Sequence, residues 1–75
     1  MQRVYVKLEW KIDAAESGFY AEAQIAGKQY NLSVKRPDPD GIVYWAIVDV
    51  FLVRCGVSPD FETAQAAAEA ACATL

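Results

Sequence analysis

The sequence contains no histidine among its 75 residues. Because histidine is the most common general base and transition-metal ligand, its absence excludes catalytic groups of the Ser-His and Cys-His types. The four glycines are dispersed one to a turn and form no phosphate-binding loop. We therefore predict that the chain is not an enzyme and needs no cofactor.

Metal-binding patterns are also missing. Asp38, Asp40 and Gly41 match a fragment of a calcium-binding loop, but the other oxygen ligands and the closing Glu do not follow at the required spacing. The only cysteines, Cys55 and Cys72, form no Cys-x-x-Cys unit. We expect no metal site, and free thiols in a reducing compartment.

Positive charge is in short supply. Seven Lys and Arg against ten Asp and Glu give a net charge of −3. Nucleic-acid phosphates and anionic membrane surfaces both call for clustered Lys and Arg, so this balance argues against direct binding to either. It suits a partner with a basic surface, and ordinary solubility would produce the same excess of acids.

A secretion signal is lacking too, because residues 1–10 alternate apolar with charged or polar side chains and contain no continuous apolar stretch. We expect a cytoplasmic protein. The same alternation continues to residue 12 and predicts a half-buried strand over residues 3–12, with Val4, Val6, Leu8, Trp10 and Ile12 on one side.

The most apolar segment present is IVYWAIVDVFLV, residues 42–53, in which Asp49 alone is polar. It is too short and too β-branched for a membrane helix, and it predicts a strand with two apolar faces. Asp49 is the expected place for a bend, or for a one-residue bulge that exchanges the two faces beyond it. Trp45, Ile47 and Phe51 are assigned to the core, which leaves uncovered Tyr44, Ala46, Val48 and Val50.

Two further alternating segments predict strands over residues 19–26 and 30–35, joined by a turn in which Gly27 takes a positive φ. Residues 36–41 hold two prolines and a glycine and predict a stiff loop. From Ser58 the apolar period becomes helical, with Ser58 as N-cap or Asp60 as a second possible cap. Glu62, Gln65 and Glu69 are expected to point to water.

These elements predict a single α+β domain over residues 1–75. Its four-stranded, mainly antiparallel sheet is a meander, and the C-terminal helix packs on one face. The expected core comprises Val4, Val6, Leu8, Trp10, Phe19, Ile25, Tyr30, Leu32, Trp45, Ile47, Phe61, Ala64, Ala68 and Leu75.

The uncovered apolar residues of the segment 42–53 are one candidate binding site, and four acidic residues form a second. Asp38 and Asp40 would join Asp60 and Glu62 in an acidic rim if the loop and the helix start lie at one end of the sheet. A solvated loop is the alternative interpretation. The predicted partner-binding residues are therefore Asp38, Asp40, Asp60, Glu62, Tyr44, Val48 and Val50.

Two resemblances bear on function. SGFYAEA at residues 17–23, and GVSPDFETA at residues 56–64 before an alanine-rich helix, are similar to the DGYYA and G-x-T-x-E-E-A segments of the HicB type of antitoxin domain. That resemblance implies a small sheet with a helix that neutralises a toxin. In size, acidity and layout the whole chain is similar to small phage and mobile-element accessory proteins, among them anti-CRISPR inhibitors.

The second resemblance implies a non-enzymatic inhibitor that occupies a functional surface of a larger host complex. We therefore predict a protein-binding protein whose partner is a host protein or complex, and the first candidate is a complex that handles nucleic acids. The alternatives are an antitoxin-like domain and a structural homo-oligomer, for instance a homodimer that buries the second apolar sheet face.

Overall fold

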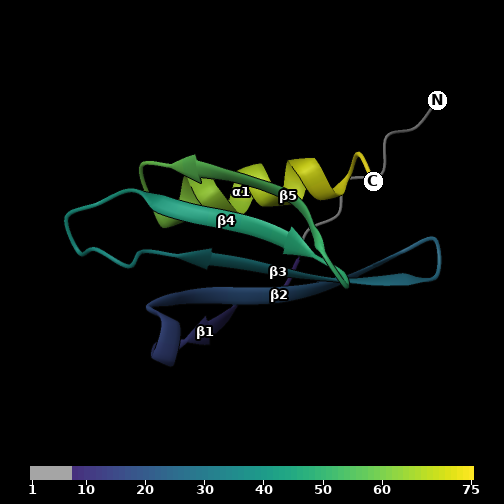
Figure 1. Cartoon of the computed structure of the whole chain (residues 1–75), viewed down its shortest axis with the longest axis horizontal. Helices are drawn as coiled ribbons and strands as arrows, with labels where there is room; N and C mark the ends of the chain where they lie inside the picture. The colour runs from purple at the N-terminus through teal and green to yellow at the C-terminus, as the bar shows by residue number, and fades with distance from the viewer. Residues whose placement is uncertain (1–7) are drawn as a thin grey trace.

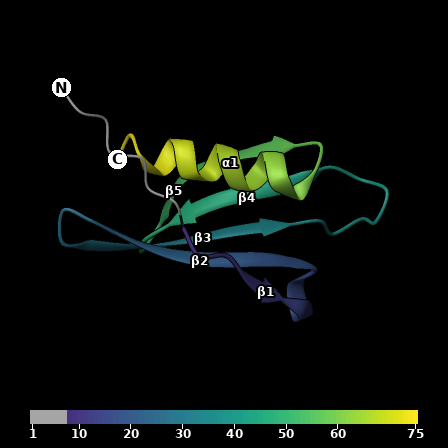
Figure 2. The same ribbon diagram turned by 180° about the vertical axis from the view of Figure 1, so that it is seen from behind.

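A computed structural model describes residues 8–75 as one twisted antiparallel sheet with a single helix packed behind it (Figure 1). The strands are β1 (Lys11–Asp13), β2 (Gly18–Ile25), β3 (Lys28–Lys35), β4 (Val43–Val48) and β5 (Leu52–Ser58), and the helix is α1 (Phe61–Cys72). A short 3-10 turn, η1 (Ala14–Glu16), joins β1 to β2. Figure 2 shows α1 lying across one face of the sheet.

The α+β class is confirmed, and the sheet has five strands in place of the predicted four, in the meander order β1-β2-β3-β4-β5. The added strand comes from residues 42–53, whose prediction as one long strand is wrong. The segment reverses direction at residues 49–51, and Val48 pairs with Leu52 across the resulting hairpin.

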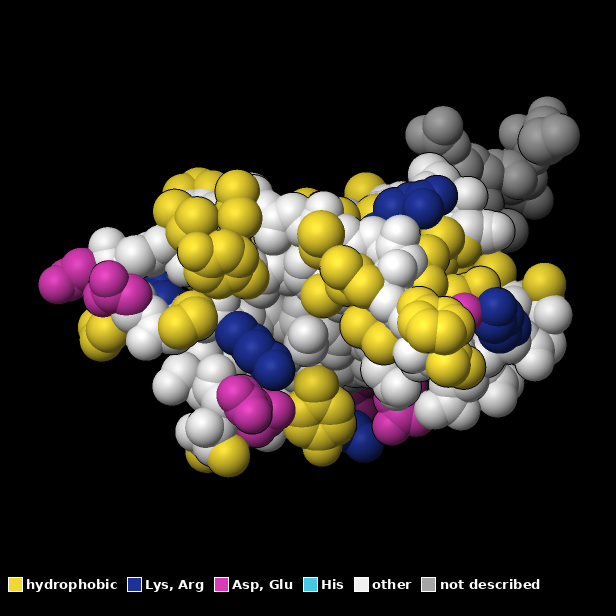
Figure 3. All heavy atoms as spheres, in the orientation of Figure 1, with side chains coloured by type: hydrophobic (Ala, Val, Ile, Leu, Met, Phe, Trp, Pro, Cys, Tyr) yellow, Lys and Arg dark blue, Asp and Glu magenta, His cyan; other side chains and the backbone are white. Residues whose placement is uncertain are grey.

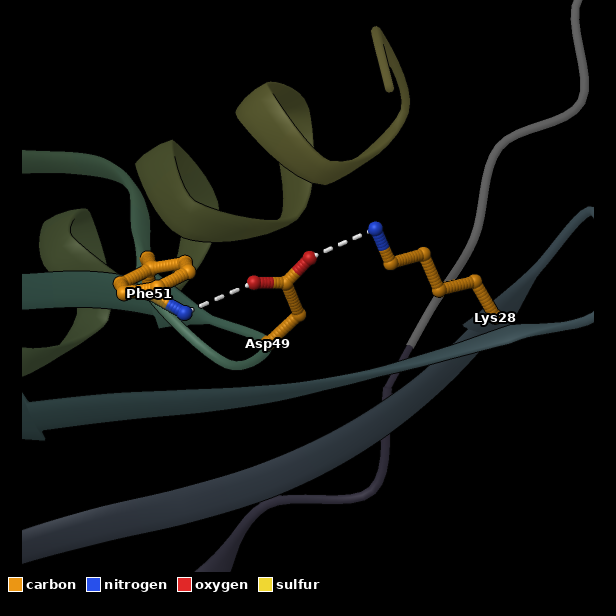
Figure 4. Close-up of polar contacts among 3 residues, drawn as sticks. All are labelled: Lys28, Asp49 and Phe51. Carbon is orange, nitrogen blue, oxygen red and sulfur yellow. Dashed lines mark hydrogen bonds and ion pairs between the residues drawn. The ribbon is translucent and has the colours of Figure 1, made fainter.

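Asp49 causes this reversal. Its Oδ1 accepts a hydrogen bond of 2.9 Å from the Phe51 amide (Figure 4). The Asp49 amide in turn donates to the Phe51 carbonyl over 3.1 Å. When a short acidic side chain accepts a hydrogen bond from the backbone amide two residues later, this bond mimics the backbone hydrogen bond of a turn. The chain therefore folds back at Asp49 instead of bending. The register shifts beside this turn, where Ile47 pairs with Arg54 and leaves Val53 as a bulge.

The first predicted strand is shorter than expected in the described residues, since only Lys11–Asp13 pairs with β2. Leu8 and Trp10 pack against the core instead, and the Leu8 amide and the Trp10 indole Nε1 donate to Glu69 Oε2 over 3.2 and 2.9 Å. The prediction that Glu69 points to water is therefore wrong. Ile12, placed on the same side as Leu8 and Trp10, is 75% exposed.

The core lies between α1 and the sheet. Alanines and a cysteine form the helix side of it, which lets the helix backbone approach the strands closely. The buried apolar residues are Ala21, Ala23, Leu32, Val34, Val43, Ile47, Ala64, Ala68 and Cys72. Most of the predicted core either belongs to this set or packs against it. Val4 and Val6 lie outside the described residues, and Phe51, which is 78% exposed in the turn, was wrongly assigned.

Gly56 explains how β5 fits beneath a large side chain. A Cβ atom at this position would lie only 2.6 Å from the Trp45 ring, so the indole lies directly over the glycine backbone. Trp45 and Gly56 are paired across β4 and β5. Glycine is thus required here for close approach.

The helix begins at Asp60. This residue has extended backbone angles, and its Oδ1 accepts a hydrogen bond of 2.7 Å from the Thr63 amide. Asp60 is therefore the cap, and the alternative cap, Ser58, instead ends β5 and is buried. The expected positive φ of Gly27 is confirmed in the β2–β3 turn. Within residues 8–75, no helix is long and apolar enough to cross a membrane.

Candidate protein-interaction surface

The sheet face turned away from α1 is apolar over β4 and β5. Three cross-strand pairs lie there, and we call them the open face: Tyr44 with Val57, Ala46 with Cys55, and Val48 with Leu52. Tyr44, Leu52 and Val57 are 52–60% exposed. Figure 3, which views this side, shows hydrophobic side chains gathered over the two strands. None of the described residues covers them.

The β4–β5 turn extends this surface at the end where Val48 meets Leu52. Val50 and Phe51 are the most exposed large apolar residues of the turn, at 82% and 78%. The Asp49 carboxylate fixes the backbone beneath them through its bond to the Phe51 amide. Because hydrogen bonds already fix the backbone of this turn, contact with another surface requires little further ordering of the backbone.

Across β2 and β3 the same side of the sheet is mainly polar, although it also carries Tyr20, which pairs with Ser33 and is 40% exposed. The residues in register with the open face there include Glu22, Asn31, Ser33 and Lys35. Glu22 accepts a hydrogen bond of 3.0 Å from the Gln29 side chain, and Lys35 lies 3.8 Å from Glu16. Charges of both signs are mixed over these strands in Figure 3. The apolar surface therefore has a polar border on its β3 side.

Four acidic residues lie at the other end of the sheet, and we call them the acidic end: Asp38, Asp40, Asp60 and Glu62. The loop that holds Asp38 and Asp40 leads into β4, whose first residue, Val43, pairs with Ser58 just before the helix. The loop and the helix start are thus brought to one end of the sheet, as the acidic-rim prediction requires. Tyr44 and Val57 are the open-face pair nearest to it.

Two of the four acids have internal roles. Asp38 Oδ1 accepts from the Asp40 amide over 3.1 Å, and Asp60 caps α1. The hydrogen bond from the Thr63 amide, helped by the nearby Arg36 charge, holds the pKa of Asp60 below its usual value. The Asp60 carboxylate therefore stabilises the start of the helix. Asp40 and Glu62 make no ion pair with any described residue.

A hollow of about 360 Å³ adjoins the acidic end, lined by Ser17, Arg36, Pro39 and Phe61. The Arg36 guanidinium lies 5.0 Å from the centre of the Phe61 ring, which meets Phe19 edge-on at 5.3 Å. The Arg36 amide donates to the Ser17 carbonyl over 3.1 Å. No pattern in the sequence indicates this grouping, because its members come from three separate segments.

Chemistry-bearing groups are sparse in residues 8–75, where no three Cys, Asp or Glu side chains are grouped so as to hold a metal ion. Both cysteines are free thiols. Cys55 is exposed on the open face. Cys72 is a buried residue of α1, and this burial raises the pKa of its thiol.

The predicted partner-binding residues thus fall into two groups. Tyr44 and Val48 lie on the open face, Val50 lies in the adjoining turn, and the loop and the helix start that carry the four acids lie at the far end of the sheet. The sequence reasoning missed Leu52, Cys55 and Val57, because residues 42–53 were treated as one strand and the partner strand β5 was not recognised. The alternation of Val53, Cys55 and Val57 could have indicated that a strand lies there, but not its register against β4.

Comparison of the chain with protein families, with curated protein sequences and with solved structures found no match.

Proposed function

We propose that this chain is a non-enzymatic protein-binding protein that docks through the open face and the β4–β5 turn. The observation that carries the proposal is the uncovered apolar surface formed by Tyr44, Leu52 and Val57 together with Val50 and Phe51. Contiguous apolar surface with a polar border is typical of protein interaction sites. Tyr44 and Phe51 supply the aromatic anchors that such sites favour.

The free energy available is adequate for specific binding. Burying a single large apolar side chain is worth about 1.5–3 kcal/mol. The apolar residues of the open face and turn together could therefore offset the cost of association, which is about 4–15 kcal/mol. Because the strands are held by the sheet and the turn by Asp49, little additional ordering is needed.

The acidic end favours a partner with a basic surface beside its apolar one. Proteins that handle nucleic acids carry clustered Lys and Arg for phosphate contacts. We therefore propose that the partner is a host nucleic-acid-handling complex and that the chain acts as its inhibitor, in the manner of a phage accessory protein. A toxin neutralised in the antitoxin manner is the second candidate, and it draws on the same two surfaces.

The test is affinity capture from host lysate with matched variants. Tyr44→Lys and Val57→Lys place a charge in the open face, whereas Ile12→Lys makes the same change at an exposed position on β1, at the far edge of the sheet. We expect one partner to be captured by the parent chain and by Ile12→Lys, and to be lost with both open-face variants. Equal capture by all four proteins would overturn the proposal.

The acidic end is tested separately on the captured partner. Asp38→Lys with Asp40→Lys should weaken binding and flatten its salt dependence, because exposed charges steer association and are screened by salt. Glu22→Lys, which reverses a charge on β2, is the control. An unchanged affinity and salt slope would remove the acidic end from the interface and leave the apolar contact in place.

A further inference from the structure

The β2–β3 hairpin runs past the end of β4. Residues 31–35 of β3 pair with β4, whereas residues 28–30 pair with β2 alone. The β4–β5 turn follows directly after Val48, the residue that pairs with Asn31. Figure 1 shows the tip of the hairpin extending beyond this turn. The overhanging end of β3 therefore lies beside the turn.

Lys28 spans the space between the two hairpins (Figure 4). Its Nζ lies 2.7 Å from Asp49 Oδ2 and 5.8 Å from the centre of the Tyr30 ring, within the range of a cation–π interaction. The Asp49 side chain is only 15% exposed, so this ion pair is screened less than one between two fully exposed groups. The other oxygen of Asp49, Oδ1, accepts the Phe51 amide over 2.9 Å. One carboxylate thus holds both the Lys28 ammonium and the Phe51 amide.

Residues 49–51 have little else to fix them. They lie between the last residue of β4 and the first residue of β5 and take no part in strand pairing. The side chains of Val50 and Phe51 are mostly exposed, so packing contributes little to their arrangement. The conformation of the turn therefore depends on where the Asp49 carboxylate is held.

We propose that Lys28 is a positioning residue for the partner-binding surface and acts through Asp49. A carboxylate bound at one oxygen alone can turn away from its donor, whereas Lys28 holds the second oxygen and keeps Oδ1 on the Phe51 amide. The turn then presents Val50 and Phe51 in one arrangement, and apparent affinity rises with the fraction of chains in the binding-competent arrangement. This inference rests on the proposed function, and it does not require Lys28 to touch the partner.

Hydrogen exchange of the Phe51 amide, measured by NMR in the free chain, tests the coupling. We expect Lys28→Met to accelerate exchange about two- to five-fold, the range that corresponds to the loss of an ion pair near the surface. Lys28→Arg keeps a cation that can bind the carboxylate and should restore the parent rate. Lys35→Met is the matched control, because it removes the 3.8 Å pair with Glu16 at the opposite end of β3 and should leave Phe51 unchanged.

A double-mutant cycle shows whether Lys28 acts through Asp49. Asp49→Asn removes the charge and keeps an oxygen that can accept the Phe51 amide, so it should accelerate exchange at least as much as Lys28→Met. Adding Lys28→Met in this background should change nothing further, because the ion pair is already absent. A further acceleration would mean that Lys28 acts by another route, such as its contact with the Tyr30 ring, and would overturn the proposal.

The affinity for the captured partner completes the test. Lys28→Met should lower it about two-fold, less than it accelerates exchange, because affinity falls only with the fraction of chains whose turn is held closed. Lys28→Arg should bind as the parent does. An unchanged exchange rate in Lys28→Met, or an affinity that does not follow the exchange rate across the variants, contradicts the proposal. Exchange is measured without a partner, whereas Tyr44→Lys and Val57→Lys test the open face by capture, so failure here and failure of the proposed function are distinguishable.

Discussion

The Nζ of Lys28 lies 2.7 Å from Oδ2 of Asp49, and this ion pair joins the β2–β3 hairpin to the β4–β5 turn (Figure 4). The other carboxylate oxygen of Asp49 accepts the Phe51 amide. These two bonds, the one from Lys28 first, lower the pKa of Asp49 to about 2. One carboxylate therefore both shapes the turn that presents Val50 and Phe51 and anchors it to the neighbouring hairpin.

The two roles of Asp49 can be separated by three variants. Lys28→Met removes the ion pair and, with it, the approach of the ammonium to the Tyr30 ring at 5.8 Å. Asp49→Asn removes the charge but keeps an acceptor for the Phe51 amide, and Asp49→Ala removes both the ion pair and the acceptor. We expect a small loss of thermal stability from the first two, as for other exposed pairs, and a larger loss of several degrees in Tm from Asp49→Ala. Thermal denaturation followed by circular dichroism measures the Tm of each variant and so ranks the three losses. If Asp49→Ala were no worse than Lys28→Met, the turn bond would be unimportant.

The lowered pKa of Asp49 predicts a pH dependence. Because its pKa falls from 3.8 to about 2 on folding, the ionised form stabilises the fold at every pH above the unfolded value. That contribution is lost as the pH falls from about 4 toward 2. Urea denaturation at a series of pH values should show a shallower decline in this window for Asp49→Asn than for the parent, and identical slopes would contradict the assignment.

Much of the fold follows from local patterns. The alternation in β2 and β3 and the helical period after Asp60 arise from which side chains each element must bury, and both are visible in the sequence. The turn at Asp49 is different. The run from Val43 to Leu52 contains no glycine or proline to mark a reversal. The turn instead depends on the carboxylate of Asp49, and the second partner of that carboxylate, Lys28, comes from another hairpin.

The close contact of Trp45 with Gly56 yields a packing prediction. Gly56→Ala would place a Cβ 2.6 Å from the indole and force the ring or the strand to move. We expect a loss of about 1–3 kcal/mol in the free energy of unfolding, the usual cost of overpacking. Urea denaturation followed by tryptophan fluorescence measures it. Gly27→Asn is the control, because nothing lies near a Cβ there and Asn tolerates the positive φ.

The candidate surface was partly predictable for a related reason. Tyr44 and Val48 were recognised as uncovered because strict alternation separates them from Trp45 and Ile47 within β4. Phe51 was misplaced because this alternation stops at the turn. Leu52 and Val57 depend on the register of β5 against β4, which the bulge at Val53 shifts by one residue. A one-residue shift exchanges the two faces, so the composition of the open face was beyond sequence patterns alone.

Glu69 provides the sharpest test of how the N-terminal segment is attached. Its Oε2 accepts from both the Leu8 amide and the Trp10 indole, in a part-buried position between the segment and α1. Glu69→Ala leaves both donors without this acceptor and should lower the free energy of unfolding by about 1–3 kcal/mol, as expected for bonds to a charged group. Glu69→Gln, which keeps an oxygen, should fall between the parent and Glu69→Ala.

Glu62→Ala is the matched control, because it removes the same side chain from an exposed position in the first turn of the same helix. We expect Glu62→Ala to lower the free energy of unfolding by less than about 1 kcal/mol, which is the scale of a favourable interaction with the helix dipole. The indole proton of Trp10 offers a second readout: its NMR resonance should move upfield and exchange faster in Glu69→Ala, and stay in place in Glu62→Ala. Equal stability losses with an unmoved Trp10 resonance would mean that Glu69 does not hold the segment against the helix.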